Sequence, residues 1–142
     1  MTHDHYPDTL IRDILTSTRT IALVGASPKP ERPSYRVMAT LLKHGYTVIP
    51  VNPGQAGKDI HGQTVVARLS DIDVPVDMID VFRAPAEMDS VVDDVFSMKT
   101  LPKYIWGQLG VRNDAAAARA EERGVTVIMD RCPAIEIPRL GL

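Results

Sequence analysis

The fold of this chain is decided by Thr20-Ile21-Ala22-Leu23-Val24-Gly25, a short apolar run that ends in glycine. Such a run is typical of a strand buried on both faces of a parallel sheet. Prolines at positions 28, 30 and 33 forbid a longer strand, and an apolar helical face follows from position 33 or 34 to position 45. A second apolar run covers residues 46–51. This order predicts a strand–helix–strand unit with a right-handed crossover.

The same alternation continues along the chain. We expect an opening helix at 8–17, strands at 76–82, 104–106 and 125–129, and helices at 85–98 and 113–123. Residues 60–69 are ambiguous, and those after 133 are expected to form a short tail. The pattern predicts an α/β fold: a Rossmann-like, doubly wound, parallel five-stranded sheet in the order 3-2-1-4-5, with helices on both faces. We expect one domain over residues 1–142, with its core at about 20–133.

Composition argues against several classes of protein. The chain has 142 residues, a formal net charge of −2 and one cysteine. Stand-alone nucleic-acid binders are usually basic, a lone cysteine forms no internal disulfide, and no apolar run approaches the ~18 residues that span a bilayer. Residues 1–6 are polar and unlike a secretory signal, so we expect a cytoplasmic protein without nucleic-acid or membrane partners.

Histidine and aspartate clusters are not interpreted as a metal site. The histidines at positions 3 and 5 are expected in a frayed terminus. The aspartates at positions 71, 73, 77 and 80 are interpreted as solvated loop and strand-edge residues, because strand alternation scatters their directions.

The loop after the first strand is the best candidate for a binding site, since ligands of open α/β sheets bind at the carboxyl ends of the strands. Gly25 permits a sharp turn, and the helix that begins near Pro33 directs its positive dipole end at the same place. This geometry predicts a phosphate-binding loop. Its other candidate contacts are small, hydroxyl-bearing or basic residues: Ala26, Ser27, Lys29, Arg32 and Ser34.

The expected nucleotide is not a nicotinamide dinucleotide. The G-x-G-x-x-G pattern fails at its second glycine in Gly25-Ala26-Ser27-Pro28-Lys29-Pro30. The acid that holds the ribose of NAD should end the second strand, and Asn52 stands there instead. An NAD(P)-binding oxidoreductase or redox partner remains the alternative, with Lys29 or Arg32 holding a 2′-phosphate.

Several segments, taken in order, carry a family resemblance: Val24-Gly25-Ala26-Ser27, Arg32-Pro33-Ser34-Tyr35, Gly45-Tyr46-Thr47-Val48-Ile49-Pro50-Val51-Asn52-Pro53, Ile60-His61-Gly62, Trp106, Gln108-Leu109-Gly110-Val111 and Asp130-Arg131-Cys132-Pro133. The sequence resembles the small stand-alone bacterial CoA-binding proteins, which in turn are similar to the N-terminal CoA-binding domain of the succinyl-CoA synthetase alpha subunit. The resemblance covers residues 20–133 and implies coenzyme A or an acyl-CoA as the ligand. Ligase activity is not implied, because the phosphorylated histidine of the synthetase belongs to a second domain.

The resemblance also implies which residues meet the ligand. The turn at Gly25 and the guanidinium of Arg32 would meet phosphates. The other implied contacts would line the nucleotide cleft (Val51, Asn52, Pro53), the adenine pocket (Phe82, Arg83, Ala84, Pro85) and the pantetheine path (Trp106, Gln108, Gly110).

We expect a binding or sensing module without catalysis. Cys132 follows the last strand and could act as a nucleophile on a thioester, but it is interpreted as a small buried hydrophobe. His61 has no base or nucleophile at readable spacing and is interpreted as a structural or surface residue. Whether another protein or a second copy of the chain binds stays open.

Overall fold

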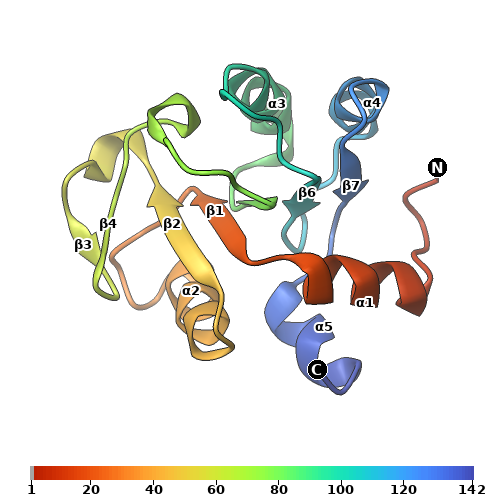
Figure 1. Cartoon of the computed structure of the whole chain (residues 1–142), viewed down its shortest axis with the longest axis horizontal. Helices are drawn as coiled ribbons and strands as arrows, with labels where there is room; N and C mark the ends of the chain where they lie inside the picture. The colour runs from red at the N-terminus through yellow and green to blue at the C-terminus, as the bar shows by residue number, and fades with distance from the viewer. Residues whose placement is uncertain (1) are drawn as a thin grey trace.

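The computed structural model describes residues 2–142 and confirms the α/β Rossmann-like fold class (Figure 1). A parallel sheet is formed by five strands: β1 (Thr20–Val24), β2 (Thr47–Val51), β5 (Met78–Val81), β6 (Tyr104–Gly107) and β7 (Thr126–Ile128). A small antiparallel hairpin is formed by β3 (Asp59–Ile60) and β4 (Gln63–Thr64). The helices are α1 (Asp8–Ser17), α2 (Pro33–Lys43), α3 (Met88–Phe96), α4 (Asp114–Glu122) and α5 (Pro133–Arg139), with short 3-10 turns η1 (Pro53–Gln55), η2 (Leu69–Asp71) and η3 (Pro85–Glu87).

The expected strand order of 3-2-1-4-5 is wrong. The sheet runs β2-β1-β5-β6-β7, so the third strand of the sheet lies beside the first and not beyond the second. The physical reason is that the outer edge of β2 is already paired. The backbone N–H of Val66 donates to the carbonyl of Pro50, and that of Asn52 donates to the carbonyl of Val66, both at 3.0 Å. The ambiguous segment 60–69 therefore covers this edge.

The start of β5 is held against β1 by Asp77. One carboxylate oxygen of Asp77 accepts the backbone N–H groups of Arg19 at 2.9 Å and Thr20 at 3.0 Å. Register then pairs Ile21 with Met78 and Val24 with Val81. This order moves the point where the chain reverses its winding to the gap between β1 and β5, where doubly wound folds bind ligands.

Helices cover both faces of the sheet, as expected (Figure 1). Helices α3 and α4 lie on one face, while α1, α2 and α5 lie on the other. Each face has its own apolar cluster, so that Ile79 and Val81 pack toward α3 and α4 while Met78 packs toward the opposite layer. None of the described helices is long and apolar enough to cross a membrane.

Three expectations about single elements are wrong. Residues after 133 do not form a tail, because α5 packs on α1 and α2. The terminus is not frayed at His3, which is buried and bonds through its two ring nitrogens to the Tyr6 hydroxyl at 2.6 Å and to Glu121 at 2.8 Å. Asp80 is not solvated, because its carboxyl lies fully buried on β5 with no hydrogen-bond partner among the described residues.

Candidate functional site

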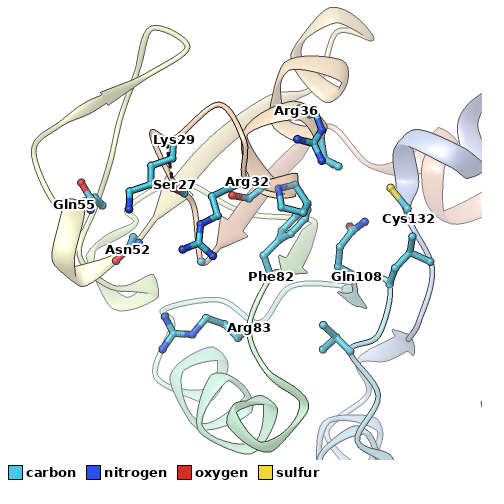
Figure 2. A pocket seen from close by; sticks show the side chains of 16 residues that line it. Ser27, Lys29, Arg32, Arg36, Asn52, Gln55, Phe82, Arg83, Gln108 and Cys132 are labelled. Atoms are coloured by element: carbon cyan, nitrogen blue, oxygen red, sulfur yellow. Dashed lines mark hydrogen bonds between the residues drawn. The ribbon is translucent and has the colours of Figure 1, made fainter.

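A cavity of about 620 Å³ opens at the carboxyl ends of β1, β5 and β6 (Figure 2). Its walls come from the β1–α2 loop, the start of α2, and the segments that follow β2, β5, β6 and β7. The volume lies within the range typical of small-molecule sites, and the place is the one expected from the winding of the sheet.

Gly25 lets the floor of the cavity form. Its φ angle is +88°, and a Cβ atom there would lie 2.2 Å from the carbonyl oxygen of Phe82. The backbone N–H groups of Gly25 and Ala26 donate to the carbonyl of Val51 at 3.0 and 3.3 Å. The ends of β1, β2 and β5 are thereby drawn together, and only glycine fits at the meeting point.

Asn52 fixes the shape of the β1–α2 loop. Its Nδ2 donates to the carbonyl of Ala26 at 2.8 Å, and its Oδ1 accepts the backbone N–H of Gly54 at 2.9 Å. A carboxylate at this position could not make the first of these bonds, because it has no N–H to donate. The residue that replaces the acid of an NAD site is thus used to hold the loop.

The charged side chains in the cavity wall are all cations. Lys29, Arg32 and Arg36 line it without an ion-pair partner among residues 2–142, and Arg83 lines it while pairing with Glu87 at 2.6 Å. Helix α2 begins at Pro33 with no side-chain cap on its described N-terminus, and its first turn also lines the cavity. The positive dipole end of α2 and the basic side chains around its first turn together suit a phosphate group.

Two segments meet at the other end of the cavity. The backbone N–H of Arg131 donates to the carbonyl of Gly107 at 3.3 Å, and the indole Nε1 of Trp106 donates to the carbonyl of Arg131 at 3.0 Å. These bonds set Gln108 beside the segment that carries Cys132, and both side chains line the cavity. Gln108 and Cys132 are each 6% exposed, and Oε1 of Gln108 has no hydrogen-bond partner among the described residues.

The structure brings many of the sequence-predicted residues together in this wall: Gly25, Ser27, Lys29, Arg32, Ser34, Asn52, Phe82, Arg83 and Gln108. Val51 and Pro53 line a neighbouring cavity of about 170 Å³ that shares Gly25 and Arg83 with the first. The main wall does not include Ala26, Ala84, Pro85, Trp106 or Gly110.

Trp106 departs most from its predicted place. Its side chain is fully buried and offers no surface to a ligand, so its implied contact with a pantetheine path needs correction. Ala26, which belongs to the β1–α2 loop, is also buried. Gly110 instead donates its N–H to the carboxylate of Asp130 at 2.7 Å, which shapes the turn after β6.

Cys132, weighed from the sequence only as a possible nucleophile, also lines the cavity, and the other lining residues are not among the predicted contacts: Pro33, Arg36, Val37, Gln55, Leu109 and Val111. Helical spacing could have found two of them, because Arg36 lies four residues after Arg32 and Val37 follows Pro33 by four. Leu109 and Val111 belong to the loop after β6, which the strand-end rule selects as a whole.

His61 takes a structural place, as expected. Its Nε2 lies 2.9 Å from the carbonyl oxygen of Tyr35, and the two rings pack with centroids 4.0 Å apart. This contact holds the β3–β4 hairpin on α2. Within residues 2–142, no group of three His, Cys, Asp or Glu side chains is placed to hold a metal ion.

Comparison with known proteins identifies relatives of this chain. The family model described as a CoA binding domain matches residues 19–138. The uncharacterized protein YneT of Bacillus subtilis (strain 168) is 36% identical over 122 residues, which cover 86% of this chain and 87% of that protein. A solved structure of a hypothetical protein from Pyrococcus horikoshii OT3 has a TM-score of 0.88 at 36% identity, covering 99% of this chain and 96% of that one.

A more distant match shows the fold alone. It is a dinucleotide-forming acetyl-coenzyme A synthetase of Ca. Korarchaeum cryptofilum, solved with phosphate and ADP, with a TM-score of 0.68 at 22% identity. The match covers 87% of this chain but 28% of the synthetase chain. Because the family model spans most of the sequence, the resemblance of the opening motifs is confirmed, and this chain belongs to the CoA-binding domain family.

Proposed function

We propose that this protein binds coenzyme A or an acyl-CoA in the 620 Å³ cavity, as a non-catalytic binding or sensing module. The observation that carries the proposal is the set of cations around the first turn of α2, in a chain that belongs to the CoA-binding domain family. A CoA carries a pyrophosphate and a ribose phosphate, and Lys29, Arg32 and Arg36 have no carboxylate competing for them within residues 2–142.

The part of the cavity wall away from these cations suits the pantetheine arm of CoA. Oε1 of Gln108 is buried and has no hydrogen-bond partner within residues 2–142, and such an acceptor is costly to leave without a donor. The pantetheine arm of CoA carries two amide N–H groups that could satisfy it. Phe82 and Val111 add apolar surface to the same cavity.

Asn52 supports CoA over a nicotinamide dinucleotide. In NAD sites, an acid at this position binds the ribose of the nucleotide. Here the Asn52 amide is already bonded to the Ala26 carbonyl and the Gly54 N–H. No comparison adds weight to an oxidoreductase.

The proposal of binding without catalysis rests on the chemistry of the wall. Among the described lining residues there is no carboxylate or imidazole that could act as a general base, and the ionised groups are all phosphate-binding types. Arg131, next to Cys132 in sequence, stacks its guanidinium on the Tyr6 ring at 5.0 Å and bonds to the carbonyl of Asp130. It is therefore engaged outside the cavity.

Titration calorimetry with CoA, acetyl-CoA, dephospho-CoA and NADPH tests the proposal. We expect CoA and acetyl-CoA to bind, dephospho-CoA to bind more weakly because it lacks the ribose phosphate, and NADPH not to displace CoA. Absence of CoA binding at millimolar ligand, or displacement of CoA by NADPH, would overturn it.

A further inference from the structure

We propose that Cys132 is a site of thiol–disulfide exchange with the disulfide form of CoA, and that the chain can carry CoA covalently as a mixed disulfide. This inference rests on the proposed function, because the same cavity must first hold the nucleotide. It assigns a modification to a side chain that the binding of CoA alone does not require.

The two ends of the cavity differ in chemistry. Figure 2 shows Lys29, Arg32 and Arg83 toward one side and Cys132 on the opposite side, all bordering one continuous cavity. CoA has the same polarity, with phosphates at one end and a sulfur at the end of the pantetheine arm. A CoA whose phosphates meet the cations would extend its arm toward Cys132.

Gln108 is the second observation that points to a ligand beside Cys132. Gln108 lines the cavity and is 94% buried, since 6% of the residue is exposed, and its Oε1 atom has no hydrogen-bond partner among the described residues. The bond from Arg131 N–H to the Gly107 carbonyl places the two neighbouring segments side by side. An amide N–H of the pantetheine arm bonded to Oε1 of Gln108 would therefore bring the terminal sulfur close to Cys132.

The loop that carries Cys132 is held firmly by its surroundings. The indole of Trp106 fixes the Arg131 carbonyl from the core, and the Tyr6 hydroxyl accepts the N–H of Met129 at 2.9 Å. Asp130 adopts a φ angle of +57° and accepts the N–H of Gly110. The thiol is thus presented into the cavity at a fixed place, and its burial shields it from disulfides that the cavity does not bind.

The exchange balances without an external oxidant. The Cys132 thiol loses its proton to solvent, and its sulfur attacks one sulfur of CoA disulfide, forming the Cys132–CoA bond. The original sulfur–sulfur bond breaks, and the departing CoA sulfur takes the electron pair and then a proton. One thiol and one disulfide are consumed, and one thiol and one disulfide are produced.

Mass spectrometry of the intact protein tests the inference. The protein is incubated with CoA disulfide or with bis(2-hydroxyethyl) disulfide, and the adduct is followed over time and then reversed with dithiothreitol. Because Cys132 is the one cysteine of the chain, an adduct that dithiothreitol removes must be attached to Cys132. We expect one CoA per chain, formed at least about tenfold faster than the small adduct, because binding raises the local concentration of the disulfide.

Two variants sharpen the test. Gln108→Met keeps the size of the side chain but removes the acceptor, and Arg32→Gln removes a phosphate contact. Each should slow labelling by CoA disulfide while leaving labelling by the small disulfide within about twofold of wild type. Equal rates with both disulfides would overturn the inference.

Calorimetry on the same sample separates the two proposals. CoA binding without a CoA adduct would overturn the exchange alone and leave the proposed function standing. Absence of CoA binding together with equal slow labelling would overturn both.

Discussion

The carbonyl oxygen of Phe82 occupies the space in which any side chain at position 25 would begin, 2.2 Å from the place of a Cβ atom. Gly25 follows β1 and Phe82 follows β5, so this contact closes the sheet at the point where its winding reverses. The cavity opens above it. The close approach of the two backbones is therefore a condition for the site as well as for the packing.

Gly25→Ala should separate these two loops and abolish CoA binding. We expect a loss of unfolding free energy of more than about 2 kcal/mol, because a methyl group meets backbone that cannot rotate away. The matched control is Gly124→Ala, where the φ angle is +84° but no atom of the described chain, apart from its chain neighbours, lies within 4 Å of the added Cβ. It should cost only about 1–2 kcal/mol and keep CoA affinity, as judged by urea melts and calorimetry. Equal effects of the two variants would contradict the role given to the contact.

Arg32→Gln should weaken CoA binding by about tenfold or more, because a charge-assisted bond to phosphate is lost. Lys103→Gln makes the same change of charge at an exposed position outside the cavity wall, and it should leave affinity within about twofold. The comparison is made by calorimetry at one salt concentration. A similar loss in both variants would mean that the net charge of the chain, and not the site, attracts the ligand.

Asn52→Asp should weaken both the fold and the site. The carboxylate cannot donate to the Ala26 carbonyl, and its charge repels phosphate, so we expect a loss of about 1–3 kcal/mol in stability and weaker CoA binding. Thermal melting and calorimetry with CoA and NAD measure the outcome. An unchanged melting temperature, or a gain of NAD binding with the loop intact, would contradict the positioning role of Asn52.

Asp80→Asn should change how stability depends on pH. Full burial raises the pKa of the Asp80 carboxyl well above its ordinary value, so the folded state prefers the protonated form. The wild-type protein is then most stabilised by this proton below the ordinary pKa of about 3.9 and loses that stability as the pH rises toward the raised pKa. The amide of the variant does not titrate. Between the ordinary and the raised pKa, the unfolding free energy of the variant should therefore rise relative to that of the wild type by up to about 1.4 kcal/mol per pH unit.

Denaturant melts from pH 4.5 to 8 measure this difference. Asp13→Asn, a matched change at an exposed position of α1, serves as the control. If the difference in unfolding free energy between wild type and Asp80→Asn stayed constant from pH 4.5 to 8, Asp80 would not be the source of the pH dependence.

Local patterns predicted most of the fold. The apolar run before Gly25 and the periodicity of α2 fixed a buried strand and its crossover, and Asn113 capped the alanine-rich α4 through a bond to the N–H of Ala116. The strand order could not be read in the same way. It depends on Val66 pairing with the edge of β2, and an isolated bridge leaves almost no periodic signal in sequence.

The site was predictable where it followed strand ends and less so where packing decided. The rule that ligands bind at the carboxyl ends of strands selected the loops of Gly25, Asn52 and Phe82. It could not tell that Trp106 turns into the core while Gln108, two residues later, turns into the cavity. The rule also did not predict the full burial of Asp80, which depends on how the helices pack against the sheet.

The most direct test of CoA binding in this cavity is a titration followed by backbone amide NMR. On addition of CoA, we predict that the largest shift changes fall on residues 25–36, 52–55, 82–83 and 108–111, which carry the cavity wall. The separate cavity near His44, Gly45 and Tyr46 should remain unaffected. The absence of shifts at millimolar CoA, or their concentration around those three residues, would contradict the account.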